Sequence, residues 1–198
     1  MSEEELPVLL AIDPSVRDLG WCCVNVNRLD PEDLYNIEAA DREAWSYGIC
    51  QMASTRQIDP ELIKYRWEEA YIELKANLDV YNNVPTYFVS EWPTFFSSER
   101  GMIAAQLNYT VGMSSMVGYL AARLGFHPRD ITLLTPQRWK GNMSKNVTKE
   151  RFIKVFGKPA QRLARMLSDD VVDAIMIARL WLTIYEKGNF RWQHPANC

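Results

Sequence analysis

The sequence has few of the residues that build zinc sites, and it lacks a stretch that could cross a membrane. It contains four cysteines and two histidines in 198 residues, with no Cys-x-x-Cys pair. We therefore expect no zinc site and reduced cysteine thiols. No apolar run is long enough to span a bilayer, and the acidic residues 1–5 are unlike a signal peptide. These features predict a protein with no membrane association and a cytoplasmic location.

Glycine is also scarce, with nine residues in the chain and no glycine-rich run after the first apolar segment. Sugar kinases and actin-like ATPases carry an Asp at the end of a strand, as residues 8–13 do here. Those proteins need glycine-rich loops because backbone amides must approach the phosphates closely. Residues 13–17 offer no such loop, which argues against this class.

The chain shows no internal repeat, no low-complexity tract and no Pro/Gly-rich linker. Its apolar fraction of 47% and its seven tryptophans are typical of a folded domain with a sizeable core. We expect one domain over residues 1–185, followed by a frayed tail over residues 186–198.

Charge is distributed unevenly along the chain. Residues 1–99 carry 19 acidic and 7 basic side chains, whereas residues 138–165 carry nine basic side chains and one acidic one. This asymmetry predicts a local anion-binding surface on an otherwise acidic protein. The alternative is a solvated basic helix face that binds nothing.

Apolar patterning predicts five strands and four helices. Short apolar or alternating runs indicate strands, and Ser15–Gly20 is typical of a turn that makes the first two strands a hairpin. Residues 27–44 are polar and fit an inserted loop, and the first half of the basic stretch is also loop-like. The predicted strands are 8–12, 21–26, 45–50 (an edge strand), 86–91 and 130–134, and the predicted helices are 60–81, 99–125, one from Thr148 and one from about Ser168.

Two of the predicted strands end in an acid that is closely followed by proline. Asp13 ends the buried run of residues 8–12, and Glu91 ends residues 86–90. Asp13 alone could simply cap a turn. In an open sheet, however, ligands bind where strand ends converge, so a second strand-terminal acid favours a shared site.

The last helix begins with further acids. Ser168 fits an N-cap, and acids in the first turn suit the helix dipole, which accounts for Asp169 and Asp170. Asp173 lies a turn further on, among apolar residues. Because Asp170 and Asp173 share a face, they would repel each other unless a cation lay between them. Asp169 could replace Asp170, since it is four residues from Asp173.

Carboxylates without His or Cys select hard cations such as Mg²⁺ or Mn²⁺. Several carboxylates can hold two such ions about 3.5–4 Å apart, the arrangement that supports phosphodiester hydrolysis. The basic stretch of residues 137–151 carries Trp139 among its charges, which suits a surface that follows a nucleic-acid backbone. Together these features predict a metal-dependent nuclease.

The order of these motifs resembles the RuvC family of Holliday-junction resolvases, in the ribonuclease H-like superfamily, and its bacteriophage-type members in particular. The resemblance spans roughly residues 8–182. It departs from the family at Ser15, where bacterial members commonly have glycine, and in residues 92–96, where no junction-centre aromatic wedge can be placed. The matching segments are Ile12-Asp13-Pro14-Ser15 with Gly20, Val89-Ser90-Glu91, Asp170-Val171-Val172-Asp173-Ala174, and Thr135-Pro136-Gln137 through Trp139-Lys140-Gly141 with Lys145 and Lys149.

The resemblance implies an α/β, ribonuclease H-like fold with a mixed five-stranded sheet flanked by helices on both faces, in a homodimer. It implies a crossover junction endodeoxyribonuclease that resolves four-way DNA junctions by paired hydrolysis with two Mg²⁺ (or Mn²⁺) per active site. A phage-encoded member would act in the host cytoplasm. The implied metal ligands are Asp13 (bridging), Glu91, Asp170 and Asp173, Lys140 and Lys145 are implied phosphate contacts, and Arg138, Trp139, Lys149 and Arg151 complete the implied DNA-binding set.

Two other functions remain open on the sequence alone. One is a broader branched-DNA or flap nuclease with the same chemistry. The other is a catalytically silent DNA-binding module of the same fold, although retention of four acids argues against it because unneeded buried charges are costly.

The helix predicted over residues 99–125 is apolar around most of its circumference and rich in small residues. A surface helix needs one apolar stripe, so a helix of this kind must be covered on two sides. We expect the sheet to cover one side and a second copy of the chain to cover the other. The alternative is that residues 60–81 of the same chain cover it.

Overall fold

The computed structural model of this protein describes residues 7–15, 17–29, 37, 44–52, 60–93, 109–141 and 145–186. Five strands form one mixed sheet in the order β3-β2-β1-β4-β5. β2 pairs antiparallel with β1 and with β3, whereas β4 runs parallel to β1 and β5. The predicted hairpin and edge strand are thus confirmed. The strands are β1 (Val8–Pro14), β2 (Asp18–Asn25), β3 (Trp45–Gln51), β4 (Tyr87–Glu91) and β5 (Ile131–Leu134).

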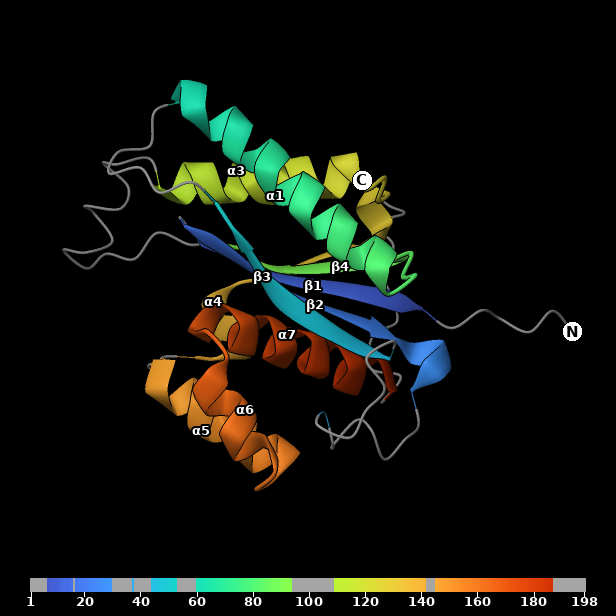
Figure 1. Cartoon of the computed structure of the whole chain (residues 1–198), viewed down its shortest axis with the longest axis vertical. Coiled ribbons are helices and arrows are strands. Elements are labelled where there is room, and N and C mark those ends of the chain that lie inside the picture. Colours follow the sequence, from blue (N-terminus) through green and yellow to red (C-terminus); the bar gives the residue numbers. More distant parts are fainter. Residues whose placement is uncertain are drawn as a thin grey trace, which may run out of the picture.

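Helices cover both faces of the sheet (Figure 1). α1 and α3 lie on one face and α7 on the other, with α5 and α6 on the side of α7 away from the sheet. None of the described helices is long and apolar enough to cross a membrane. The helices are α1 (Pro60–Val80), α3 (Tyr109–Arg123), α4 (Pro136–Trp139), α5 (Lys145–Phe156), α6 (Ala160–Met166) and α7 (Asp169–Glu186), with 3-10 turns η1 (Val26–Arg28) and η3 (Pro128–Asp130).

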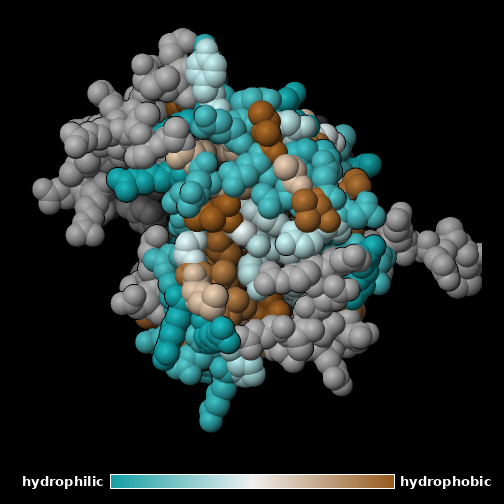
Figure 2. Space-filling model, viewed as in Figure 1, coloured by the Kyte–Doolittle hydropathy of each residue, from teal (hydrophilic) through white to brown (hydrophobic). Residues whose placement is uncertain are grey.

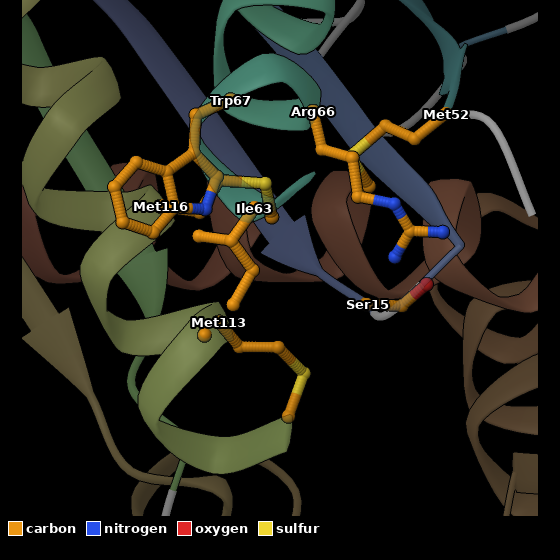
Figure 3. Close-up of a pocket in the computed structure, with 8 residues that line it drawn as sticks. Ser15, Met52, Ile63, Arg66, Trp67, Met113 and Met116 are labelled. Carbon is orange, nitrogen blue, oxygen red and sulfur yellow. The ribbon is translucent and has the colours of Figure 1, made fainter. Parts of the chain in front are cut away.

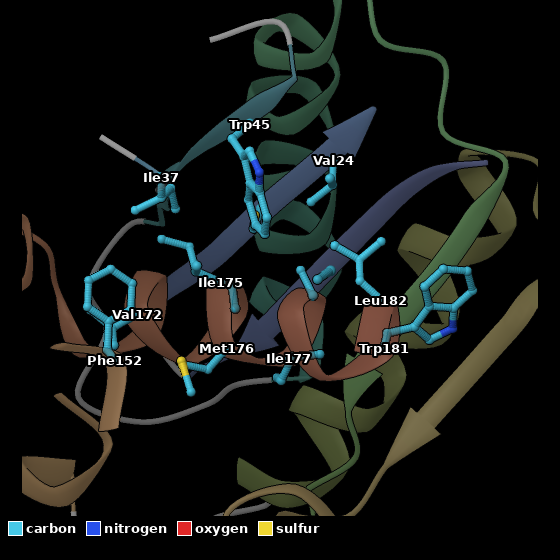
Figure 4. Close-up of a cluster of buried hydrophobic side chains, with 14 of the residues drawn as sticks. Val24, Ile37, Trp45, Phe152, Val172, Ile175, Met176, Ile177, Trp181 and Leu182 are labelled. Carbon is cyan, nitrogen blue, oxygen red and sulfur yellow. The ribbon is translucent and has the colours of Figure 1, made fainter. Parts of the chain in front are cut away.

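The alternation of side chains along β1 divides the core into two clusters. Leu9 and Ala11 belong to the cluster under α7, whereas Leu10 and Ile12 pack under α1 and α3. Successive side chains of a strand point to opposite faces, so the next residue of the first series, Asp13, belongs to the α7 face. Figure 4 shows the α7 cluster, in which apolar side chains of the helix lie between the strands and the outer helices.

The first hairpin is longer than the sequence predicted. β2 begins at Asp18 rather than Trp21, and Pro14 pairs with Leu19 instead of ending the strand. The parallel pairing of β1 with β4 stops at Ile12 and Ser90. Pro14 therefore lies beyond that ladder, where a missing N–H is tolerated.

Two boundaries in the basic stretch also differ from the prediction. Residues 136–139 form the short helix α4, with Pro136 in its first turn, a position that suits proline. α5 begins at Lys145 rather than at Thr148, which lies inside the helix with its side chain buried. Of the helix predicted over 99–125, the structure describes α3, and residues 99–108 lie outside the described residues.

α1 packs along α3, so residues of the same chain cover part of this helix, as the alternative expected. Arg123 of α3 is 2.9 Å from the Glu68 carboxylate of α1 and lies over the Tyr71 ring at 4.4 Å. Several apolar or small positions of α3 remain outward, among them Val111, which is 56% exposed, and Gly118, where a Cβ would meet open space. Part of α3 is therefore still available to a second copy.

The described cysteines, Cys22, Cys23 and Cys50, are buried free thiols. Burial raises the pKa of each thiol above its ordinary value, which keeps the reactive thiolate form scarce. These residues are therefore part of the core, and Cys198 lies outside the described residues.

Candidate active site

The site begins at the ends of two neighbouring parallel strands. Ile12 of β1 lies opposite Ser90 of β4, so the next residues, Asp13 and Glu91, lie side by side just beyond the parallel pairing of the two strands. The side chains of both acids point to the face of the sheet that α7 covers. Asp13 is only 6% exposed, and a buried carboxylate requires compensating partners.

α7 reaches this point because Gly20 has no side chain. Gly20 pairs with Asp13 across the hairpin, and a Cβ at this position would lie 2.1 Å from the backbone oxygen of Asp170. The first turn of α7 can therefore lie directly on β2. This close approach explains how the helix brings its acids to the end of β1.

The acids at the start of α7 have different partners. Ser168 caps the helix as predicted, because its Oγ accepts a hydrogen bond from the Val171 N–H at 3.3 Å. Asp169 forms an ion pair with Lys149 at 2.9 Å. Asp173 is 3% exposed and contributes to the site itself. The pairing of Asp169 with α5 favours Asp170 as the residue that acts with Asp173.

Electrostatics connect the four acids. Burial raises the pKa of Asp13 well above its ordinary value, and the charges of Glu91, Asp173 and Asp170 raise it further. Lys140 acts in the opposite direction but does not reverse the shift. The structure thus brings together the four carboxylates that the sequence singled out from three separate segments.

Lys140 supplies positive charge to this group. Its Nζ lies 3.0 Å from Glu91 Oε2 and 3.1 Å from Asp173 Oδ2. Burial lowers the pKa of Lys140, but Glu91, Asp173 and Asp13 raise it, and the net result lies above its ordinary value. Lys140 is therefore a charged ammonium inside the acidic site.

Trp139 has a contact that the sequence did not reveal. Its indole N–H donates a hydrogen bond of 2.7 Å to Glu91 Oε2, and its ring is almost fully buried. Arg151 donates to the Trp139 carbonyl oxygen at 3.4 Å. Trp139 therefore orients Glu91 in this structure, and a stacking role toward DNA stays a prediction. The adjacency of Trp139 to Lys140 was the one signal in the sequence.

The remaining predicted basic residues lie in different environments. Arg138 on α4 and Arg151 on α5 are exposed, which suits contact with a nucleic acid. Lys149 is engaged by Asp169 and also donates to the Leu167 carbonyl oxygen at 3.3 Å. Lys145 begins α5, and its side chain lies outside the described residues.

The chemistry of these donors fits a hard divalent cation. The four carboxylates supply oxygen ligands, with no imidazole or thiolate among them, and a single ammonium does not balance their charge. Within the described ranges, no three His, Cys, Asp or Glu side chains are arranged as a ready ligand set. In the arrangement described, the Lys140 ammonium is the cation that bridges Glu91 and Asp173.

A small cavity between α1 and α3 is not part of this site. It measures about 20 Å³, which leaves room for about one water molecule. Figure 3 shows Ile63 and Trp67 of α1 facing Met116 of α3 around it. We interpret this cavity as a packing gap in the core.

No protein-family model and no curated protein matches this sequence. The order and direction of the strands and their two helical layers define the ribonuclease H-like α/β fold that the sequence predicted. Among solved structures, RuvC of Thermus thermophilus in complex with a Holliday junction substrate has a TM-score of 0.57 and 16% sequence identity, covering 92% of this chain and 97% of that one. A second T. thermophilus RuvC structure has a TM-score of 0.49 and 17% identity, with 91% and 96% covered. The fold of this chain is therefore RuvC-like.

Proposed function

We propose that this protein is a metal-dependent endonuclease that cuts branched DNA, and that it resolves four-way junctions by paired phosphodiester hydrolysis. The observation that carries the proposal is the meeting of Asp13, Glu91 and Asp173, with Asp170 beside them, at one end of the sheet. The RuvC-like fold supports the choice of substrate, because the similar RuvC structure holds a Holliday junction.

Asp13, Glu91, Asp170 and Asp173 would hold two Mg²⁺ or Mn²⁺ ions. Such a pair of ions activates the attacking water and stabilises the leaving oxygen when bound. Trp139 orients Glu91 for this role. The close packing at Gly20 supports the site by placing α7 beside Asp13.

Lys140 is the side chain best placed to contact the scissile phosphate. Its charge is maintained by the surrounding acids, and its ammonium is partly exposed at the site. A DNA phosphate would offer the ammonium a new partner, and Lys145 could add a second contact. Contact with the scissile phosphate would explain why the Lys140 ammonium lies among potential metal ligands.

The proposal is tested by incubating the purified protein with four-way junction, fork, flap and linear duplex DNA in Mg²⁺ or Mn²⁺. We expect symmetric paired nicks in the junction, no cleavage in excess EDTA, and binding without efficient turnover in Ca²⁺, which would position the attacking water poorly. Preferential flap cleavage would support the broader nuclease instead. Junction binding without cleavage of any substrate would support the silent module.

The basic stretch is expected to bind the DNA backbone. Replacing Lys140, Lys145 and Lys149 together by Ala should weaken binding and flatten its salt dependence by about 0.9 in the log–log slope for each lysine that contacts a phosphate. Affinity for a junction measured at several salt concentrations gives this slope.

The matched control is Lys64→Ala, which removes an exposed charge from α1 on the opposite face of the sheet. It should leave the slope unchanged. An unchanged slope in the triple variant would mean that the basic stretch is a solvated helix face.

We also propose a homodimer formed through the outward side of α3. A two-fold dimer would present two identical sites to a two-fold-symmetric junction, which permits paired nicks. Figure 2 shows hydrophilic residues over much of the face drawn and a band of apolar residues near its centre. Val111 on α3 is exposed, which makes it a specific candidate for a partner contact.

Light scattering should report about twice the chain mass of 22.9 kDa at micromolar concentration. Val111→Glu should shift the protein toward the monomer, because a charge would be buried in the interface. Val80→Glu at the exposed end of α1 is the control and should leave the dimer intact. A monomer that still makes paired nicks would contradict the dimer.

A further inference from the structure

A second cavity lies between α5 and α7, behind the acidic site. Its volume is about 390 Å³, which lies within the range of small-molecule binding sites. The residues that line it include no Asp or Glu. Nothing in the proposed metal chemistry uses this space.

One side of the cavity is positively charged. Arg151 and Lys154 lie three residues apart on α5, so they share a face of the helix. Arg179 approaches from α7, where its guanidinium donates a hydrogen bond to the Thr183 hydroxyl. A phosphate bound at this side of the cavity could form charge-assisted hydrogen bonds with these side chains.

The other side of the cavity is apolar. Val155 of α5 and Met176 and Leu180 of α7 contribute aliphatic surface, and Trp139 adds an aromatic side chain. A ligand that satisfies both sides must combine an anionic group with an apolar, preferably flat, body. Inorganic phosphate alone would leave the apolar side in contact with water.

We propose that this cavity binds a single nucleotide, with its phosphate at Arg151, Lys154 and Arg179 and its base against the apolar wall. The inference deepens the proposed function and rests on it for the origin of the nucleotide, because a DNA strand at the acidic site would supply one nearby. Trp139 joins the two sites, since it lines the cavity and also donates to Glu91.

A base in this cavity cannot be paired or stacked within a duplex. The free energy needed to unpair a nucleotide is lowest where the duplex is already interrupted. The cavity would therefore favour DNA at a branch point over a continuous duplex. A free nucleotide has the same chemistry, so the two sources must be separated by experiment.

The first test titrates thymidine 5′-monophosphate into the wild-type protein in EDTA, followed by amide shifts in NMR spectra. EDTA removes metal ions that could bridge the nucleotide to the acids. We expect saturable shifts confined to α4, α5 and α7, and binding at least ~10-fold tighter than that of thymidine or of inorganic phosphate, since each of these lacks one half of the ligand.

Two variants probe the two sides separately. Lys154→Ala removes an exposed charge and should weaken nucleotide binding about 10-fold, as expected for loss of one charge-assisted contact. Leu180→Trp fills the cavity while keeping its charges, and should abolish binding of the nucleotide. Arg162→Ala on α6 removes an exposed charge that does not line the cavity and should change nothing.

Competition identifies the source of the nucleotide. With Asp13→Asn in EDTA, displacement of thymidine monophosphate by junction DNA, but not by an equal length of duplex, would assign the cavity to a strand of the branch. Simultaneous binding of junction and nucleotide would assign it to a free nucleotide, and either result supports a nucleotide site.

The inference is overturned if thymidine monophosphate causes no shifts in α5 and α7, or binds no better than phosphate. It is also overturned if Arg162→Ala weakens binding as much as Lys154→Ala does. If Leu180→Trp fails to fold, the effect of Lys154→Ala on nucleotide binding tests the inference instead. Should the protein bind the nucleotide but cut no branched DNA, the proposed nuclease function fails while the cavity remains a nucleotide site.

Discussion

Replacing any one of Asp13, Glu91 or Asp173 by its amide should abolish DNA cleavage while leaving junction binding largely intact. Asp13 and Asp173 are buried, and Glu91 and Asp173 both contact Lys140, so these acids are placed to hold cations rather than the DNA backbone. We expect the cleavage rate to fall by more than about 100-fold. Mutation of residues that only support metal ligands already costs up to about 100-fold in metal affinity or activity, and loss of a ligand itself should cost more. Single-turnover cleavage of a labelled junction and its affinity in Ca²⁺ give the two quantities.

Asp169→Asn is the matched control, because Asp169 lies next to Asp170 but is paired with Lys149. It should retain most of its activity. Wild-type rates in any two of the Asp13, Glu91 and Asp173 variants would exclude these residues as the catalytic centre.

Stability should change in the opposite direction to activity in Asp13→Asn. The raised pKa of Asp13 means that the folded protein binds its proton more tightly than the unfolded chain does. Metal-free stability therefore falls as pH rises from the ordinary value of about 3.9 through the folded pKa. In EDTA at pH 7, Asp13→Asn should melt at a higher temperature than the wild type, and the difference should vanish near pH 3.

Gly20→Ala should remove activity although residue 20 has no functional group. The new methyl group would lie 2.1 Å from the Asp170 backbone oxygen, so α7 must move away from β2. A displacement of about 1 Å at a catalytic group can cost about 100-fold in rate, and overpacking costs roughly 1–3 kcal/mol of stability. Cleavage rate and thermal melting measure both effects.

Gly48→Ala is the control that distinguishes displacement of α7 at the active site from a general loss of stability. Gly48 lies on the edge strand β3, where a Cβ would meet only the Trp21 ring, at 3.1 Å. This variant should be destabilised yet active once folded. Equal losses of activity in the two variants, at temperatures where both are folded, would show that the contact at Gly20 has no special role in the site.

Much of this arrangement could be predicted from local patterns. The unbroken apolar run of residues 8–12 predicted a strand buried on both faces, and the acids at the ends of residues 8–12 and 86–90 indicated a shared site. These features follow from strand geometry and from the rule that parallel strands end at one edge. The acids of α7 could be predicted because Asp173 lies among apolar residues, where no helix cap explains it.

Contacts between distant elements could not be predicted in this way. The Trp139–Glu91 hydrogen bond and the Lys149–Asp169 ion pair depend on how α4 and α5 dock against the sheet and α7. The role of Gly20 depends on the distance between two elements 150 residues apart in sequence. The cationic cavity was also missed, because its charges come from α5 and α7, and Arg179 lies outside the basic stretch.

The most direct test of the account is a calorimetric titration of Mn²⁺ into the metal-free protein without DNA. The account predicts saturable binding to the wild type and to Asp169→Asn, and its loss in Asp13→Asn, because Asp13 lies at the centre of the carboxylates. Absence of saturable binding in the wild type, or equal binding in Asp13→Asn, would contradict the proposal that these four acids form a metal centre.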